Sequence, residues 1–114
     1  MKHVAAANYL FAAGVLGERP PADAADECGP DSVKTKDAVI AYVKESFAYL
    51  HKAAKSINND VNSVEPMKSA FGQGSGVRTG TRLGLVTGAI EHSANHYGQI
   101  VEYLRMNGIA PPAQ

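Results

Sequence analysis

The stretch LVTGAIEHSANHYGQIVEY, residues 85–103, decides the fold of this chain. Its apolar and ring-bearing positions recur at spacings of three and four, which is the period of an α-helix with one inward face. The residues expected on that face are Leu85, Ala89, His92, His96, Ile100 and Tyr103. The stretch therefore predicts a long helix that is capped by Thr79 or Thr81 and runs to about Asn107.

Two imidazole rings share this inward face. His92 and His96 are four residues apart, so their Cβ atoms lie about 5–6 Å apart and both rings can reach one ion. An unpaired polar ring on a buried face costs about 1–3 kcal/mol, and a shared metal ion removes that cost. Imidazole suits Zn²⁺, Ni²⁺, Cu²⁺ and Fe²⁺, and we expect Zn²⁺ or Ni²⁺. Such pairs also occur by chance in many helices, and two ligands are too few for a tight site, so a third ligand must come from elsewhere.

Two further helices are expected earlier in the chain. Alanines together with four larger apolar side chains favour a helix over residues 2–16, ended by Gly17. A second periodic run follows an N-cap at Asp31 or Ser32 and stops at Asn58, with the apolar seam Ile40, Val43, Phe47, Leu50, Ala54 and Ile57. The sequence thus predicts an all-α fold, a bundle of three helices in one domain over residues 1–114.

The two connections lack the pattern of a regular element. Residues 18–30 contain Pro20, Pro21 and Pro30, and residues 60–80 contain several glycines. Both are long enough for antiparallel neighbours or for a crossover, so the sequence leaves the topology open.

Composition excludes some classes of function. The chain has 114 residues, with 11 Lys and Arg against 11 Asp and Glu, so it lacks the basic excess that nucleic-acid binding needs. No apolar run approaches the roughly 20 residues that cross a bilayer. A single cysteine, Cys28, cannot form an internal disulfide, which fits a reducing compartment. We therefore expect a cytoplasmic protein that binds neither nucleic acid nor a membrane.

Several other polar or small residues are expected to have minor roles or none. Gln99 and, less strongly, Asn95 can hydrogen-bond a ligand imidazole or reach the open side of the metal, or they meet solvent instead. His51 falls off the apolar seam, so it should be exposed and not a ligand. Gly98 is expected to permit close helix packing, and no tyrosine is assigned a catalytic role.

Three segments resemble one known family. The run HSANHYGQIVEYLRMNGIAPP, residues 92–112, resembles the signature that closes proteins of the DinB/YfiT-like superfamily. The segments HVAAANYLFAAGVLGE, residues 3–18, and KESFAYLHKA, residues 44–53, resemble earlier helices of the same family. The resemblance implies a helical bundle that holds a metal with three histidines. It identifies His92 and His96 as two ligands and His3 as the third.

The resemblance also implies a function, and the chain departs from the family in one respect. Related proteins include thiol-dependent transferases, so a metal-dependent enzyme that uses a small thiol or another small molecule is expected, with the electrophile entering over the loop at residues 72–80. Family domains usually begin with one more helix than this chain shows, so we expect part of a four-helix bundle, completed by homodimer formation. The alternative is a non-catalytic helical assembly module with relic histidines.

Overall fold

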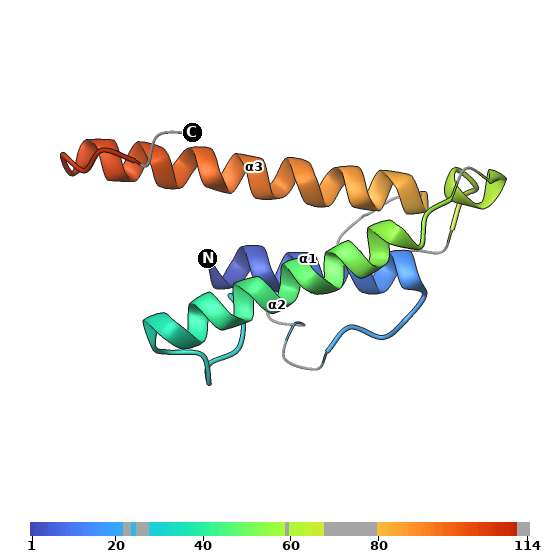
Figure 1. Ribbon diagram of the computed structural model, residues 1–114, viewed down its shortest axis with the longest axis horizontal. Coiled ribbons are helices and arrows are strands. Elements are labelled where there is room, and N and C mark those ends of the chain that lie inside the picture. Colours follow the sequence, from blue (N-terminus) through green and yellow to red (C-terminus); the bar gives the residue numbers. More distant parts are fainter. Residues whose placement is uncertain (22–23, 25–27, 59, 68–79, 112–114) are drawn as a thin grey trace.

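Three α-helices make up most of the described part of the chain (Figure 1). The computed structural model describes residues 1–21, 24, 28–58, 60–67 and 80–111. Within these ranges lie α1 (Lys2–Leu16), α2 (Lys36–Lys55), a 3-10 turn η2 (Val61–Ser63) and α3 (Arg82–Met106). The described residues form no strand, only an isolated bridge between Met67 and Gly80. The predicted all-α fold with three helices is confirmed.

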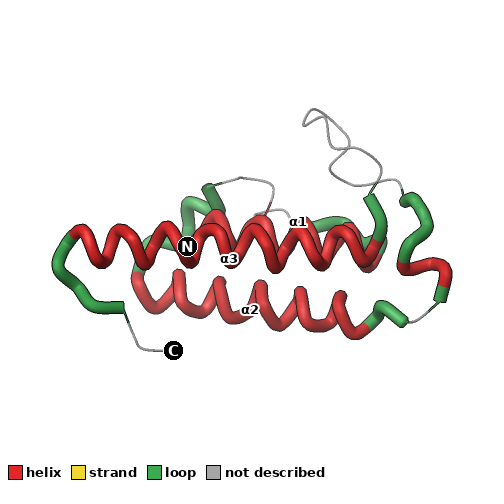
Figure 2. Tube along the Cα trace, turned by 90° about the horizontal axis from the view of Figure 1, so that it is seen from above, coloured by secondary structure: helices red, strands yellow, loops and turns green. Residues whose placement is uncertain are grey.

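α1 and α2 run in the same direction and α3 runs against both (Figure 1). Asn8, in the middle of α1, bonds to Ser46 of α2 and to Ser93 of α3, which fixes the register of all three helices. The connection between α1 and α2 therefore returns along the bundle as a crossover. In the view from above, α3 lies over α1 and α2 runs beside them (Figure 2).

α1 is the central helix of the bundle. Its neighbours cover it on two sides, and eight of its fifteen residues are buried. Small alanine side chains suit this position, because a helix that is apolar around most of its circumference can be packed from several directions. The chief core cluster joins α1 to both neighbours and consists of Ala12, Val15, Leu50, Ala53, Leu85 and Ala89.

Two glycines allow α1 and α3 to approach closely. A Cβ added at Gly14 would lie 3.0 Å from Leu85 Cδ1, and one added at Gly88 would lie 3.4 Å from Phe11 Cε1. Gly98, which was expected to permit close packing, has no atom within 4 Å of an added Cβ. That prediction is wrong, because Gly98 lies on the exposed side of α3.

The capping residues explain where each helix begins and ends. Gly17 ends α1 with φ 68°, as predicted, and the Thr81 hydroxyl accepts a hydrogen bond from Gly84 N at the start of α3. The prediction of Asp31 or Ser32 as the cap of α2 is wrong. Thr35 caps it instead, by accepting from Ala38 N at 3.2 Å. All three residue types make good N-caps, so sequence alone did not separate them.

The buried face of α2 is turned relative to the predicted seam. Tyr42, Ser46, Leu50 and Ala53 are buried, whereas Ile40 and Phe47 are 41% and 37% exposed. Leu50 of the predicted seam is buried in the core cluster, so the seam is right there and wrong at Ile40 and Phe47, which lie at the exposed edge of the buried face. None of the helices in the described ranges is long and apolar enough to cross a membrane.

α3 extends beyond the start of α1. A helix of 25 residues is about 37 Å long and one of 15 residues about 22 Å, so α1 covers only part of its neighbour (Figure 1). Tyr103 was predicted to face inward, but it is 66% exposed. The prediction fails because α1 provides no residue opposite this last part of α3.

Candidate metal centre

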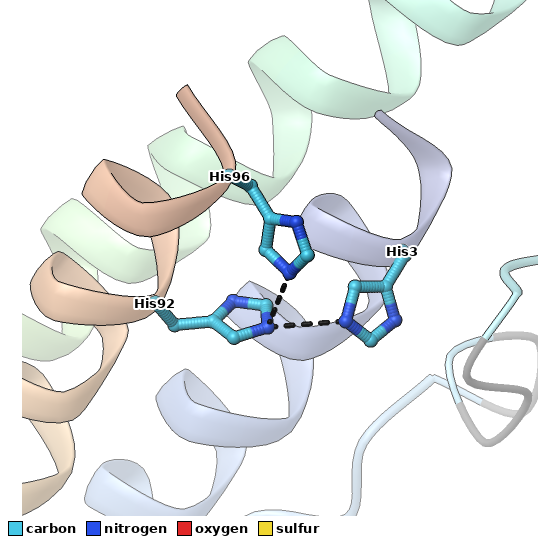
Figure 3. Close-up of side chains that lie close together, drawn as sticks. All are labelled: His3, His92 and His96. Atoms are coloured by element: carbon cyan, nitrogen blue, oxygen red, sulfur yellow. Dashed lines mark hydrogen bonds between the residues drawn. The ribbon is translucent and has the colours of Figure 1, made fainter. Parts of the chain in front are cut away.

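Three histidine rings converge where the first turn of α1 meets the middle of α3 (Figure 3). Nε2 of His92 lies 3.1 Å from Nε2 of His3 and 3.2 Å from Nε2 of His96. The rings meet edge to face, with centroids 4.6–5.0 Å apart. One nitrogen of each ring lies within 4.8 Å of the other two. The structure thus brings together the three residues that were predicted as ligands.

The spacing of these nitrogens fits a shared transition-metal ion. Zn–N bonds of about 2.0–2.1 Å at tetrahedral angles place two ligand nitrogens about 3.3–3.4 Å apart. The two Nε2 distances of 3.1 and 3.2 Å are close to this value. Three imidazoles occupy three positions of a tetrahedron and leave the fourth for another ligand. The cluster can therefore hold a metal with an open position.

The surroundings of His92 keep its ring neutral. Burial lowers the pKa of His92, and charge on His96 and then on His3 lowers it further. A neutral imidazole is the form that binds a metal. Its Nδ1 is buried and has no hydrogen-bond partner among the described residues, so packing holds the ring in place. Phe11 supplies part of this packing, with its centroid 6.1 Å from that of His92.

The first turn of α1 is held by the crossover connection. Lys2 Nζ donates to the carbonyl of Pro30 at 2.9 Å. Gly29 adopts φ 74°, and a Cβ there would lie 2.8 Å from Lys2 Cβ and 3.2 Å from the Lys2 carbonyl oxygen. Only glycine fits this close approach without strain. The contact fixes the residue that precedes His3 and so the position of the His3 ring.

A buried polar chain sets the position of α3 beside α1. The Ser93 hydroxyl donates to Asn8 Oδ1 at 3.4 Å, and Asn8 Nδ2 donates to the Ser46 hydroxyl at 3.3 Å. Ser46 in turn donates to the Val43 carbonyl at 2.8 Å. Asn8 and Ser46 are fully buried, and Ser93 directly follows His92. The sequence analysis missed these residues, although an asparagine within an alanine-rich helix is a signal that a buried partner exists.

The remaining predicted site residues lie apart from the cluster. His51 is exposed on α2, as expected. Gln99 and Asn95 are both exposed on α3, and in the described part of the chain neither has a hydrogen bond to the three rings. The glycines at positions 72, 74 and 76, over which an electrophile was expected to enter, lie outside the described residues.

Two hollows border the histidine cluster. An open groove of about 620 Å³ is lined by His3 together with Lys2, Cys28, Lys34 and apolar side chains. A smaller and more enclosed cavity of about 180 Å³ is lined by His96 and Ser93 together with apolar side chains. One ring of the cluster therefore lines each of two hollows of different character.

The sequence of the chain matches a family model described as DinB superfamily over residues 1–100. The chain belongs to the DinB superfamily. The DinB match spans all three histidines and all three helices up to Ile100 of α3. No curated protein and no solved structure matches the chain. The resemblance inferred from the sequence is confirmed at the level of the family.

Proposed function

We propose that this DinB protein is a metal-dependent enzyme of the thiol-transferase type, with Zn²⁺ or Ni²⁺ held by His3, His92 and His96. The convergence of three Nε2 atoms on one point carries the proposal. The resemblance to DinB/YfiT-like proteins, which include thiol-dependent transferases, supports the reaction class. When bound, such a metal supplies a Lewis-acid position that lowers the pKa of a coordinated thiol.

The residues of the chain have three roles in this proposal. Phe11 excludes water from one side of the His92 ring, and burial keeps that ring neutral. The Gly29–Lys2 contact holds the turn that carries His3. The groove beside His3 provides a path for a small thiol, and Lys34 on its wall can attract an anionic substituent of that thiol. The chain thus orients the ligands and leaves one side of the cluster open.

Metal content tests the first part of the proposal. Protein purified without an affinity tag should contain about one Zn²⁺ or Ni²⁺ per chain by elemental analysis. His92→Ala and His96→Ala should each lose most of this metal, because two imidazoles hold an ion weakly. His51→Ala is the matched control, since His51 is exposed and lies outside the cluster. Equal metal content in all of these variants would contradict the proposed site.

Spectroscopy of the cobalt-loaded protein tests the second part. Addition of a small thiol should produce a sulfur-to-cobalt charge-transfer band, because thiolate is a good ligand for this ion. His3→Ala, which alters the coordination, should change the band. A cobalt spectrum that thiols leave unchanged would remove the transferase function and leave a structural metal.

A second candidate function rests on the exposed apolar side chains of α3. Ile90, Tyr103 and Met106 of α3 are more than half exposed, as is Ile109 just after the helix. Surfaces of this kind favour association, and a two-fold homodimer is the commonest form. In this alternative the protein is a helical assembly module and the histidines are relics. Sedimentation that shows a dimer without bound metal would favour it over the enzyme.

A further inference from the structure

The small cavity beside His96 has a composition unlike that of the groove beside His3. Five apolar or aromatic side chains make most of its wall: Met1, Val4, Phe47, Tyr97 and Ile100. No charged side chain lines it, whereas Lys2 and Lys34 both line the groove. The two hollows that border the cluster therefore suit different chemical groups.

Two polar groups of the cavity wall already have partners elsewhere in the bundle. The Ser93 hydroxyl donates its proton to Asn8, and His96 directs Nε2 at His92. A charged group placed in the cavity would lose its hydration without gaining an ionic partner among the side chains of the wall, which is unfavourable. An uncharged apolar group would instead bury its surface against Val4 and Ile100, which is favourable. The cavity selects an uncharged apolar group.

The volume of the cavity limits the size of that group. It measures about 180 Å³. Engineered apolar cavities of about 150 Å³ in another protein stay dry and bind benzene. A single aromatic ring or a branched aliphatic group of similar size fits this volume.

We infer that this cavity is the subsite for an uncharged, ring-sized apolar group of the substrate that reacts at the histidine cluster. The wall formed by His96 would place the substituent carried by that group beside one ring of the cluster. The assignment as a substrate subsite rests on the proposed function, whereas binding of an apolar group to the cavity is measurable without it.

Fluorobenzene followed by ¹⁹F NMR is a direct probe of the cavity. It should bind to the metal-free protein, and 4-fluorobenzoate, which adds a charge to the same ring, should bind at least about tenfold more weakly. Ile100→Trp should fill the cavity and raise the Kd for fluorobenzene about tenfold or more. Ile90→Trp is the matched control, because Ile90 is on the same helix but 62% exposed and outside the cavity. Its Kd should equal that of the unaltered protein.

Circular dichroism shows whether the Ile100→Trp variant is folded. Should it fail to fold, Tyr97→Ala provides a second variant. Tyr97 is 48% exposed and forms one wall, so its removal opens the cavity without disturbing the core. This variant should also bind fluorobenzene more weakly than the unaltered protein does.

Loading the protein with Co²⁺ tests the cavity and the metal site independently. Paramagnetic Co²⁺ at the histidines should broaden the ¹⁹F signal of bound fluorobenzene, and Zn²⁺ should not. If the protein binds fluorobenzene but no metal, the proposed function fails while the apolar cavity stands. If the protein binds metal but not fluorobenzene, or if Ile100→Trp binds the probe normally, the inference is overturned. Probe binding that weakens as protein concentration rises would assign the cavity to a second copy of the chain and would overturn it also.

Discussion

The two ends of the bundle are built on different principles. At the closed end, where α1 and α2 finish and α3 begins, Leu85 packs into the core cluster and Arg82 joins all three helices. Its Nε donates to the Val15 carbonyl at 3.0 Å, and Nη2 donates to the Ser56 hydroxyl at 2.8 Å. At the histidine end, where α1 begins, the three rings border two hollows. The difference indicates that the closed end supplies stability and the histidine end holds the three-histidine cluster.

The largest effect on stability is expected at the closed end. Leu85 is buried in the core cluster, so Leu85→Ala should lower the free energy of unfolding by about 2–5 kcal/mol. Leu83→Ala is the control, because Leu83 is on the same helix but 47% exposed, and it should cost less than about 1 kcal/mol. Chemical denaturation measures both values. Equal losses of unfolding free energy would show that burial of Leu85 in the core cluster is not what stabilises the closed end.

A pair of glycines tests how the histidine end is held. Both Gly29 and Gly17 have positive φ, so replacement by alanine should cost each about 1–2 kcal/mol of backbone strain. An added Cβ would collide with Lys2 only at Gly29, since nothing lies within 4 Å at Gly17. Gly29→Ala should therefore also weaken metal binding, as measured by competition with a chelator, and Gly17→Ala should not. Unchanged affinity in Gly29→Ala would mean that the crossover does not position His3.

The two ends also differ in how much of their structure could be predicted from the sequence. Periodicity and caps predicted α1 and most of α3, because Gly17 and Thr81 are local signals that act within one turn. Periodicity also predicted which side of α3 carries His92 and His96. It could not predict that Tyr103 is exposed, because that depends on where α1 begins and not on the spacing within α3.

Residues that meet across helices were harder to predict. His3 was identified from a family resemblance alone, since 89 residues separate it from His92. Asn8, Ser46 and Ser93 were missed, because nothing local shows which polar side chains will face each other once the helices pack. Their partners are fixed by the register of the bundle, which the sequence left open.

Acidification should weaken the histidine end of the metal-free protein. Burial lowers the pKa of His92 in the folded state, and positive charge on His96 and then on His3 lowers it further. Below the unfolded value of about 6.5 the unfolded chain binds more protons than the folded one, so stability falls as the pH falls towards the folded pKa. Denaturation at pH 7.5 and 5.5 should show this loss. His92→Gln should reduce it, while His51→Gln should leave it unchanged.

The smallest effect is expected from an exposed contact at the closed end. The Tyr49 hydroxyl donates to the Glu18 carboxylate at 2.6 Å. Burial raises the pKa of Tyr49 to about 12, with smaller contributions from this hydrogen bond and from the charge of Glu18. A raised tyrosine pKa stabilises the fold up to about pH 10 and the effect is lost between pH 10 and 12. Absorbance titration should show a tyrosine that ionises near pH 12 and disappears in Tyr49→Phe. Tyr103→Phe, at an exposed position, should leave that late transition in place.

The central claim is that three imidazoles from two distant segments bind one metal ion. X-ray absorption at the zinc edge of the tag-free protein tests it most directly. The structure predicts three imidazole nitrogens at about 2.0–2.1 Å, and two in the His3→Ala variant. A spectrum dominated by oxygen ligands, or one with three imidazoles in both proteins, would contradict the claim.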